Sequence, residues 1–203
     1  MTKFLREWQD RAEFWSTEYA GHAVELARRA SESGFGTVVA AGGDGTAHDV
    51  ANGLLAANRQ DTIFAVFPVG SANDYAYSVK HQIGLSKLDD ESNTRVDVGS
   101  VRTSDGRERF FIESVGLGLS GCVTMESRKI RHLQGPLLYG LAALRALKSN
   151  PLSELELQWD DQPPEIRSIL LLTVLLGQRE GSFRLAPKAV LDDGLFDFVY
   201  AGP

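Results

Sequence analysis

The sequence predicts an α/β fold followed by a mostly antiparallel β part, and three observations support this prediction. Residues 37–41 form a short apolar segment that leads through a glycine-rich turn into a helical pattern. A second apolar segment at 63–67 completes a β–α–β unit, which implies parallel strands and a right-handed crossover. Beyond about residue 94, short strand-like segments and turns predominate. We therefore expect two domains, at 1–94 and 95–203.

The helices of the first domain follow from apolar spacing and from the residues that begin or end helices. A helix is expected over 20–33, because small apolar residues recur on one face and Gly34 follows the last of them. A second helix is expected over 47–57. It would begin with a capping box, in which Thr46 is the N-cap and Asp49 stands at the third helical position.

The second domain is expected to combine a hairpin, one helix and further strands. Apolar segments at 96–101 and 109–115 flank the turn 104–106, which predicts the hairpin. A helix with leucines on one side is expected over 136–149. The apolar run 169–176 is too short to span a bilayer as a helix and indicates a strand buried on both faces. The remaining strands are expected near 154–159, 167–176 and 195–200.

The turn Gly42-Gly43-Asp44-Gly45-Thr46 is the most informative feature of the chain. Glycines at a strand-to-helix corner let the backbone approach a ligand closely and point N–H groups at it, which suits a phosphate. Asp44 does not suit a bare phosphate, since two like charges about 4 Å apart repel by roughly 1 kcal/mol in water and about 4 near a protein surface. A divalent cation between them turns this repulsion into attraction. The turn therefore predicts a nucleotide bound together with Mg²⁺.

Two further turns carry acidic residues. The turn 68–74 follows the second strand and ends in Asp74, and it would face the same crevice because the carboxyl ends of parallel strands meet there. The segment 185–197 contains Asp192-Asp193-Gly194. This sequence is typical of a hairpin turn, but adjacent carboxylates beside backbone carbonyls also hold Mg²⁺. Both interpretations stay open for this third turn.

The composition excludes several classes of protein. The 203 residues include 21 Lys and Arg against 27 Asp and Glu, so the formal net charge of −6 gives no general attraction to nucleic acid. The single cysteine, Cys122, cannot form an intrachain disulfide and is expected to be a small core residue. The first residues lack the apolar run of a signal peptide. We therefore expect a cytoplasmic protein.

The three turns together resemble the diacylglycerol kinase catalytic-domain family, in particular the bacterial lipid kinases related to sphingosine kinase. The block at 68–76 matches a family block that normally has threonine where this chain has Ser71. The matching segments follow the family's order over nearly the whole chain: 17–23, 42–54, 68–76, 96–99 and 187–197. The resemblance implies a Rossmann-like α/β nucleotide-binding domain followed by a β-sandwich domain.

The resemblance also implies an enzyme that transfers phosphate from ATP to a diacylglycerol-like lipid with Mg²⁺. Asp44, Asp74 and Asp97 would belong to a network of carboxylates, water and Mg²⁺ between the domains. Asp193, with the main-chain carbonyls of Val190 and Leu195, would hold a second, structural Mg²⁺. The residues expected to contact ATP are Thr17, Gly42, Gly43, Asp44, Gly45, Thr46, Ala47, His48 and Ser71.

Members of this family begin with a further strand and phosphate loop, and they continue into an Asp-Gly-Glu segment whose acid serves as the base. We therefore expect the glutamate base to lie outside this chain and the β-sandwich domain to be incomplete here. Because positioning and general-base catalysis each contribute about 10²-fold or more, we expect the 203-residue chain to transfer little phosphate by itself.

Two other functions remain open. NAD kinases share the Gly-Gly-Asp-Gly-Thr turn, so a kinase with a soluble substrate is one alternative. A non-catalytic nucleotide-binding module is the other.

The partners are less closely defined. The basic segment 128–132 and the leucines after it are consistent with peripheral contact at the inner membrane face. The alternative is a helix that packs its leucines on a sheet. A homodimer is a further expectation.

Overall fold

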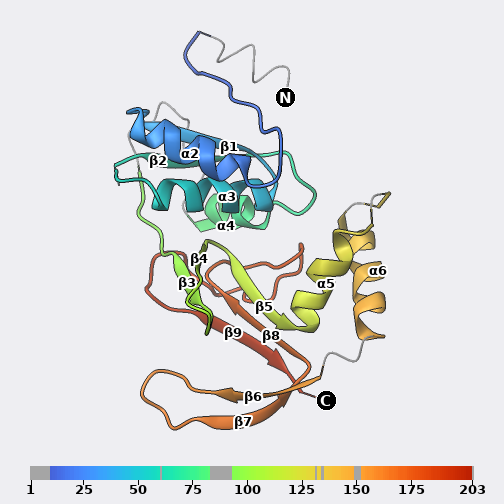
Figure 1. Cartoon of the computed structure of the whole chain (residues 1–203). Coiled ribbons are helices and arrows are strands. Elements are labelled where there is room, and N and C mark those ends of the chain that lie inside the picture. Colours follow the sequence, from blue (N-terminus) through green and yellow to red (C-terminus); the bar gives the residue numbers. More distant parts are fainter. Residues whose placement is uncertain are drawn as a thin grey trace.

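The computed structural model describes residues 10–59, 61–82, 93–130, 132, 133, 135–148 and 152–202. In Figure 1, helices α2, α3 and α4 and strands β1 and β2 lie in the upper part of the view, and the β-rich part lies below them with α5 and α6 at its side. The elements up to α4 lie in the upper part, and those from β3 onward lie in the lower part.

The β–α–β unit is present as the sequence predicts. Strands β1 and β2 are parallel, with Thr37 opposite Ile63 and Gly42 opposite Pro68. Gly34 has a φ of 92°, the left-handed conformation that glycine adopts readily just after a helix. The elements of this part are α2 (His22–Glu32), β1 (Thr37–Gly42), α3 (Asp44–Leu55), β2 (Ile63–Pro68) and α4 (Asp74–Gln82).

Helices α2 and α3 pack closely against one another. Both helices bury alanines on their facing sides, and Gly53 of α3 lies directly against α2. A Cβ atom built on Gly53 would come within 2.3 Å of the Val24 carbonyl oxygen and 2.8 Å of the Ala27 Cβ. The small residues of these two helices therefore set the distance between them. The core around them consists of Ala23, Ala27, Ala40, Ala47, Val50, Ala51, Tyr75 and Ile112.

The β-rich part contains three small sheets. Strand β8 lies between β5 and β9, and the pairs β3–β4 and β6–β7 are antiparallel hairpins. All pairings in this part are antiparallel, as expected. Its elements are β3 (Gly99–Arg102), β4 (Glu108–Phe111), β5 (Ser114–Gly118), α5 (Leu119–Ser127), α6 (Gly135–Leu147), β6 (Ser153–Leu157), β7 (Glu165–Ile169), β8 (Leu171–Leu175) and β9 (Asp197–Ala201).

Side chains from α3 and α4 join the two parts. The Asn52 side chain donates to the Phe110 carbonyl oxygen at 3.0 Å and accepts from the Phe110 N–H at 3.2 Å. Strand β4 pairs with β3 on one side only, and the Asn52 amide satisfies the backbone N–H and carbonyl of Phe110 that a further strand would otherwise bind. Ile112, just beyond β4, packs into the core of the α/β part. The two parts therefore share both hydrogen bonds and apolar contacts.

Three predictions about element boundaries are wrong. The capping box is absent, because α3 begins three residues earlier: its N-cap is Gly43, and Asp44 lies in the first turn. The predicted strand 167–176 is two strands, separated at Leu170, because β7 pairs with β6 whereas β8 pairs with β5 and β9. The hairpin is shorter than expected, since Val115 belongs to β5 in another sheet.

Helix α5 was not predicted, and α6 buries a different face from the one expected. Helix α6 packs against α5 rather than laying its leucines on a sheet. Its buried residues are Leu138, Ala142 and Ala146, at a spacing of four, whereas Leu137 and Leu144 are 74% and 64% exposed. Cys122 of α5 is half-buried.

The predicted fold class, an α/β part followed by a β-rich part, is confirmed. The exact domain boundary near residue 94 stays a prediction. Among the helices of the described residues, none has the length and apolar composition needed to cross a membrane.

The contact of Gly53 with α2 gives a test of this packing. Gly53→Ala is expected to destabilise the protein by about 1–3 kcal/mol, because the new methyl group would force α2 and α3 apart. Gly140→Ala is the matched control, since a Cβ atom there meets nothing within 4 Å in helix α6. Its expected effect is a gain of about 0.5–1 kcal/mol. Urea unfolding measures both, and equal effects would contradict the packing described.

Candidate functional site

The two glycine-containing turns of the α/β part touch one another through their backbones. A Cβ atom on Gly43 would lie 3.1 Å from the Gly70 Cα, and one on Gly70 would lie 2.3 Å from the Gly43 Cα. The Val69 N–H donates to the Gly42 carbonyl oxygen at 3.0 Å. The geometry therefore brings the two turns to one place, as expected from the parallel strands that precede them.

Asp44 and Asp74 lie at the starts of α3 and α4, beside these turns. The Asp44 carboxylate accepts the Tyr75 N–H at 3.1 Å, which ties the start of α3 to the start of α4. Burial and the nearby Asp44 raise the pKa of Asp74 to about 6. The two acids thus lie close together, whereas the family resemblance implied a network that also contains Asp97.

The Asp74 side chain is also bound by the β-rich part. It is only 5% exposed and accepts the backbone N–H of Ser182 at 3.0 Å and 3.2 Å with its two oxygens. Gly181 supplies a further backbone hydrogen bond. Both residues have positive φ, 59° for Gly181 and 73° for Ser182, so this tight turn directs its N–H groups at the carboxylate.

A third acid, Glu113, lies near this pair and was not predicted from the sequence. Its Oε1 accepts hydrogen bonds from the Ser78 hydroxyl at 3.0 Å and from the Arg179 N–H at 3.4 Å, whereas its Oε2 has no partner. Burial is the main reason that the pKa of Glu113 is raised to about 8, and the charges of Asp74 and Asp44 add to it. The signal that could have found it is one acid in an otherwise apolar segment, Phe110-Phe111-Ile112-Glu113.

Asp97 contacts the third turn instead of the acid pair. Its carboxylate accepts the Gly194 N–H at 2.7 Å, and its own N–H donates to the Leu191 carbonyl oxygen at 2.7 Å. Asp193 accepts the Leu195 N–H at 3.0 Å. These bonds are those of a well-formed turn, in which Gly194 has a φ of 74°.

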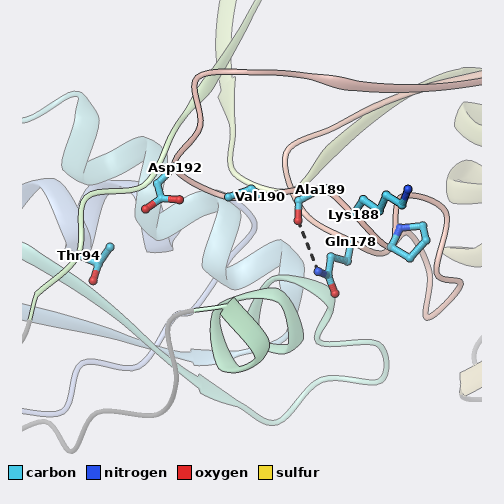
Figure 2. A pocket seen from close by; sticks show the side chains of 7 residues that line it. Thr94, Gln178, Lys188, Ala189, Val190 and Asp192 are labelled. Carbon is cyan, nitrogen blue, oxygen red and sulfur yellow. Dashed lines mark hydrogen bonds between the residues drawn. The ribbon is translucent and has the colours of Figure 1, made fainter.

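The third turn borders an open cavity of about 550 Å³. In Figure 2 the Gln178 side chain bonds to the Ala189 carbonyl oxygen, and Asp192 and Thr94 lie on the opposite side from Lys188. In the described part of the chain, no group of three or more His, Cys, Asp or Glu side chains is arranged to hold a metal ion. The cavity is lined by Thr94, Gln178, Pro187, Lys188, Ala189, Val190 and Asp192.

The other residues expected at the nucleotide lie around the first two turns. Thr17 and Ser71 are exposed, and Thr46 folds back over Gly42, where a Cβ atom would meet its hydroxyl at 2.3 Å. Burial is the main reason that the pKa of His48 is lowered. Ala47 packs in the core, so only its backbone is available for a ligand. Gly45 is exposed.

The site has the chemistry needed for a magnesium nucleotide. The first N–H groups of a helix have no partner inside the helix, and α3 and α4 both begin here. Mg²⁺ is commonly bound by one or two carboxylates together with water and substrate phosphates. Asp44 and Asp74 match that donor set. Burial is the main reason that the pKa of Asp74 is raised, and the smaller contribution from the charge of Asp44 is one that a cation would offset.

Comparison with known proteins identifies the family. Residues 1–101 match the model of the diacylglycerol kinase catalytic domain, and residues 113–203 match the YegS C-terminal NAD kinase beta sandwich-like domain. The two matches follow one another along nearly the whole chain. The protein therefore belongs to the diacylglycerol kinase catalytic-domain family.

Curated relatives agree with this assignment, and a solved structure agrees with the fold. The diacylglycerol kinase of Bacillus subtilis (strain 168) is 31% identical over 190 residues, covering 91% of this chain and 61% of the relative. The diacylglycerol kinase of Staphylococcus saprophyticus is 28% identical, and the match covers 91% of this chain and 60% of the relative. A crystal structure of a diacylglycerol kinase from Bacillus anthracis str. Sterne superposes with a TM-score of 0.63 at 19% identity, over 92% of this chain and 61% of that one. The chain thus spans about three fifths of the length of these relatives.

The raised pKa of Glu113 predicts how stability depends on pH. The folded protein holds this proton up to about pH 8, whereas the unfolded chain releases it near pH 4.5, so the free energy of unfolding should fall as pH rises between these values. Each unit of difference between the folded and unfolded pKa contributes about 1.4 kcal/mol to the free energy of unfolding. Glu113→Gln, which keeps the shape of the protonated acid, should remove most of this fall in thermal unfolding from pH 5 to 9. Glu154→Gln, at an exposed position, is the control. An unchanged profile in Glu113→Gln would contradict the assignment.

Proposed function

We propose that this protein is a lipid kinase, or part of one. The enzyme would transfer a phosphoryl group from ATP to the hydroxyl of a diacylglycerol-like lipid, with Mg²⁺. The observation that carries the proposal is the pair of the half-buried Asp44 and the buried Asp74, placed where two glycine turns meet. Phosphoryl transfer depends mostly on positioning and on neutralising charge. The family assignment and the names of the relatives support a lipid as the acceptor.

The nucleotide would lie across the two turns. Backbone N–H groups at the starts of α3 and α4 would bind its phosphates, with Thr46 and Ser71 hydroxyls beside them. Thr17 would contact it from the segment that precedes α2. The missing side chains at Gly43 and Gly70 let the two turns lie directly against one another, which brings the starts of α3 and α4 to the same ligand.

Asp44 and Asp74 would hold the magnesium ion of the nucleotide, with Asp97 more distant through water. When bound, Mg²⁺ would offset the charge of the phosphates at these carboxylates. A second ion at Asp193 and the carbonyls of Val190 and Leu195 is a separate part of the proposal. The raised pKa of Asp197, caused by burial and then by the nearby Asp193, is consistent with an acidic turn that gains from a cation.

The lipid would approach from the side of α6. Leu137 and Leu144 are exposed on this helix, and Arg128 with Lys129 lies at the end of α5 that leads to it. Apolar side chains beside basic ones are typical of proteins that bind peripherally at an anionic membrane surface. We therefore include peripheral contact with the inner membrane face in the proposal. A homodimer would present two such faces to one surface.

Transfer of ³²P from ATP to diacylglycerol in mixed micelles tests the function, with NAD offered in parallel as a soluble acceptor. Transfer to diacylglycerol that requires Mg²⁺ supports the proposal, even at a low rate. Transfer to NAD alone would contradict the acceptor and favour a soluble-substrate kinase. Binding of Mg-ATP without any transfer would favour a non-catalytic nucleotide-binding module.

Asp44→Asn tests the role of the acid pair directly. Asparagine keeps the shape of the side chain and its bond to the Tyr75 N–H but removes the charge, so the fold should persist while the Mg²⁺-dependent part of ATP binding is lost. Isothermal titration with ATP, in Mg²⁺ and in EDTA, measures this. Asp49→Asn, in the same helix, is the control. If Asp44→Asn binds ATP as the parent does in both buffers, the proposed role is wrong.

Asp193→Ala tests the second ion. A cation that binds only the folded state stabilises it by mass action, so the parent should unfold at a higher temperature in Mg²⁺ than in EDTA. Asp193→Ala should reduce that difference. Equal losses on chelation in the two proteins would leave Asp193 as a turn residue alone.

A further inference from the structure

Helix α4 presents three residues in turn to one segment of the β-rich part. Asp74, Tyr77 and Ser78 stand at positions i, i+3 and i+4, which share a face of a helix. The Ser182 N–H donates to Asp74, and the Gln178 N–H donates to the Ser78 hydroxyl at 3.0 Å. The segment 178–182 therefore follows this face of α4 over its first turn, from Asp74 to Ser78.

Arg179 lies between those two bonds. Its backbone N–H bonds to Glu113, which fixes the start of the side chain. Its guanidinium carbon stands 3.2 Å from the centre of the Tyr77 ring, a close cation–π contact. The aromatic ring thus holds the planar group from one face and leaves the edges that carry its N–H donors to other partners.

The donors of Arg179 are not all used within the protein. Its Nε is buried and has no hydrogen-bond partner. A buried donor without a partner costs free energy comparable to a lost hydrogen bond, and more when the group is charged. An unpaired donor of this kind indicates that a ligand accepts the hydrogen bond from Arg179 Nε.

The surrounding charges indicate what that acceptor would be. Arg179 acts electrostatically on Asp74, which in turn lies close to Asp44 and Glu113. A magnesium nucleotide bound by the acid pair would bring three phosphates to this place. Arginine binds phosphate well, because its planar fork of donors matches two phosphate oxygens at once.

We propose that Arg179 binds the terminal phosphate of the nucleotide, held in place by Tyr77. This inference rests on the proposed function and adds a residue to it. In this arrangement Arg179 is a catalytic residue: it would neutralise charge on the phosphoryl group during transfer, from the side of the β-rich part. The contact would exist only when segment 178–182 is packed on α4, so it makes phosphate binding depend on the joined domains.

A series of nucleotides tests the inference, using isothermal titration of the full chain with ATP, ADP and AMP in Mg²⁺. Arg179→Met is expected to weaken ATP binding about tenfold or more, ADP binding less, and AMP binding hardly at all, because only the terminal phosphate loses its partner. Arg179→Lys should recover part of the ATP affinity through its charge. Arg184→Met, at an exposed position in the neighbouring segment, is the control and should bind all three as the parent does.

The outcomes separate this inference from the function on which it rests. If the parent binds no nucleotide, both are wrong. If the parent prefers ATP and Arg179→Met keeps that preference, the inference alone is wrong. If Arg179→Met loses ATP and AMP affinity equally and unfolds at a lower temperature, Arg179 serves the packing of α4 and the inference is again wrong.

Discussion

The hydrogen bond from the Ser182 N–H to Asp74 joins the two parts of the molecule at its most highly charged point. Asp74 could not remain buried beside Asp44 without donors to its oxygens, and those donors come from a turn of the β-rich part in a left-handed conformation. The nearby bonds of Ser78 to Glu113 and Gln178 extend the same junction along α4. The geometry of the acid pair therefore depends on both parts at once. A change that separates them would alter the site even if each part kept its own fold.

Much of the fold and of the acid pair could be predicted from the sequence, because both follow from local patterns. The parallel strands and the turns after them were found from apolar segments and glycines, and Asp44 and Asp74 stand directly in those turns. Helix α5 was missed because its residues show no apolar periodicity. The division of 167–176 into two strands was missed because it depends on which distant strands each half pairs with.

Glu113 and Arg179 were not predicted, for a related reason. Each is defined by contacts with residues far away in sequence, Ser78 and Tyr77 respectively, and neither belongs to a glycine turn. The same holds for the face of α6, where the leucines suggested a buried stripe but the smaller Ala142 and Ala146 are the buried residues. Small side chains allow the close approach of α5 and α6, and that choice depends on the partner helix rather than on hydrophobicity alone.

Strand β9 has a consequence beyond the site. It lies at the edge of its three-stranded sheet, with Phe198 and Tyr200 both more than two fifths exposed. An edge strand offers a row of backbone donors and acceptors to any other strand that arrives, and aromatic neighbours strengthen such pairing. Strand β9, which pairs with β8 on one side, therefore offers its other side for pairing with a further strand.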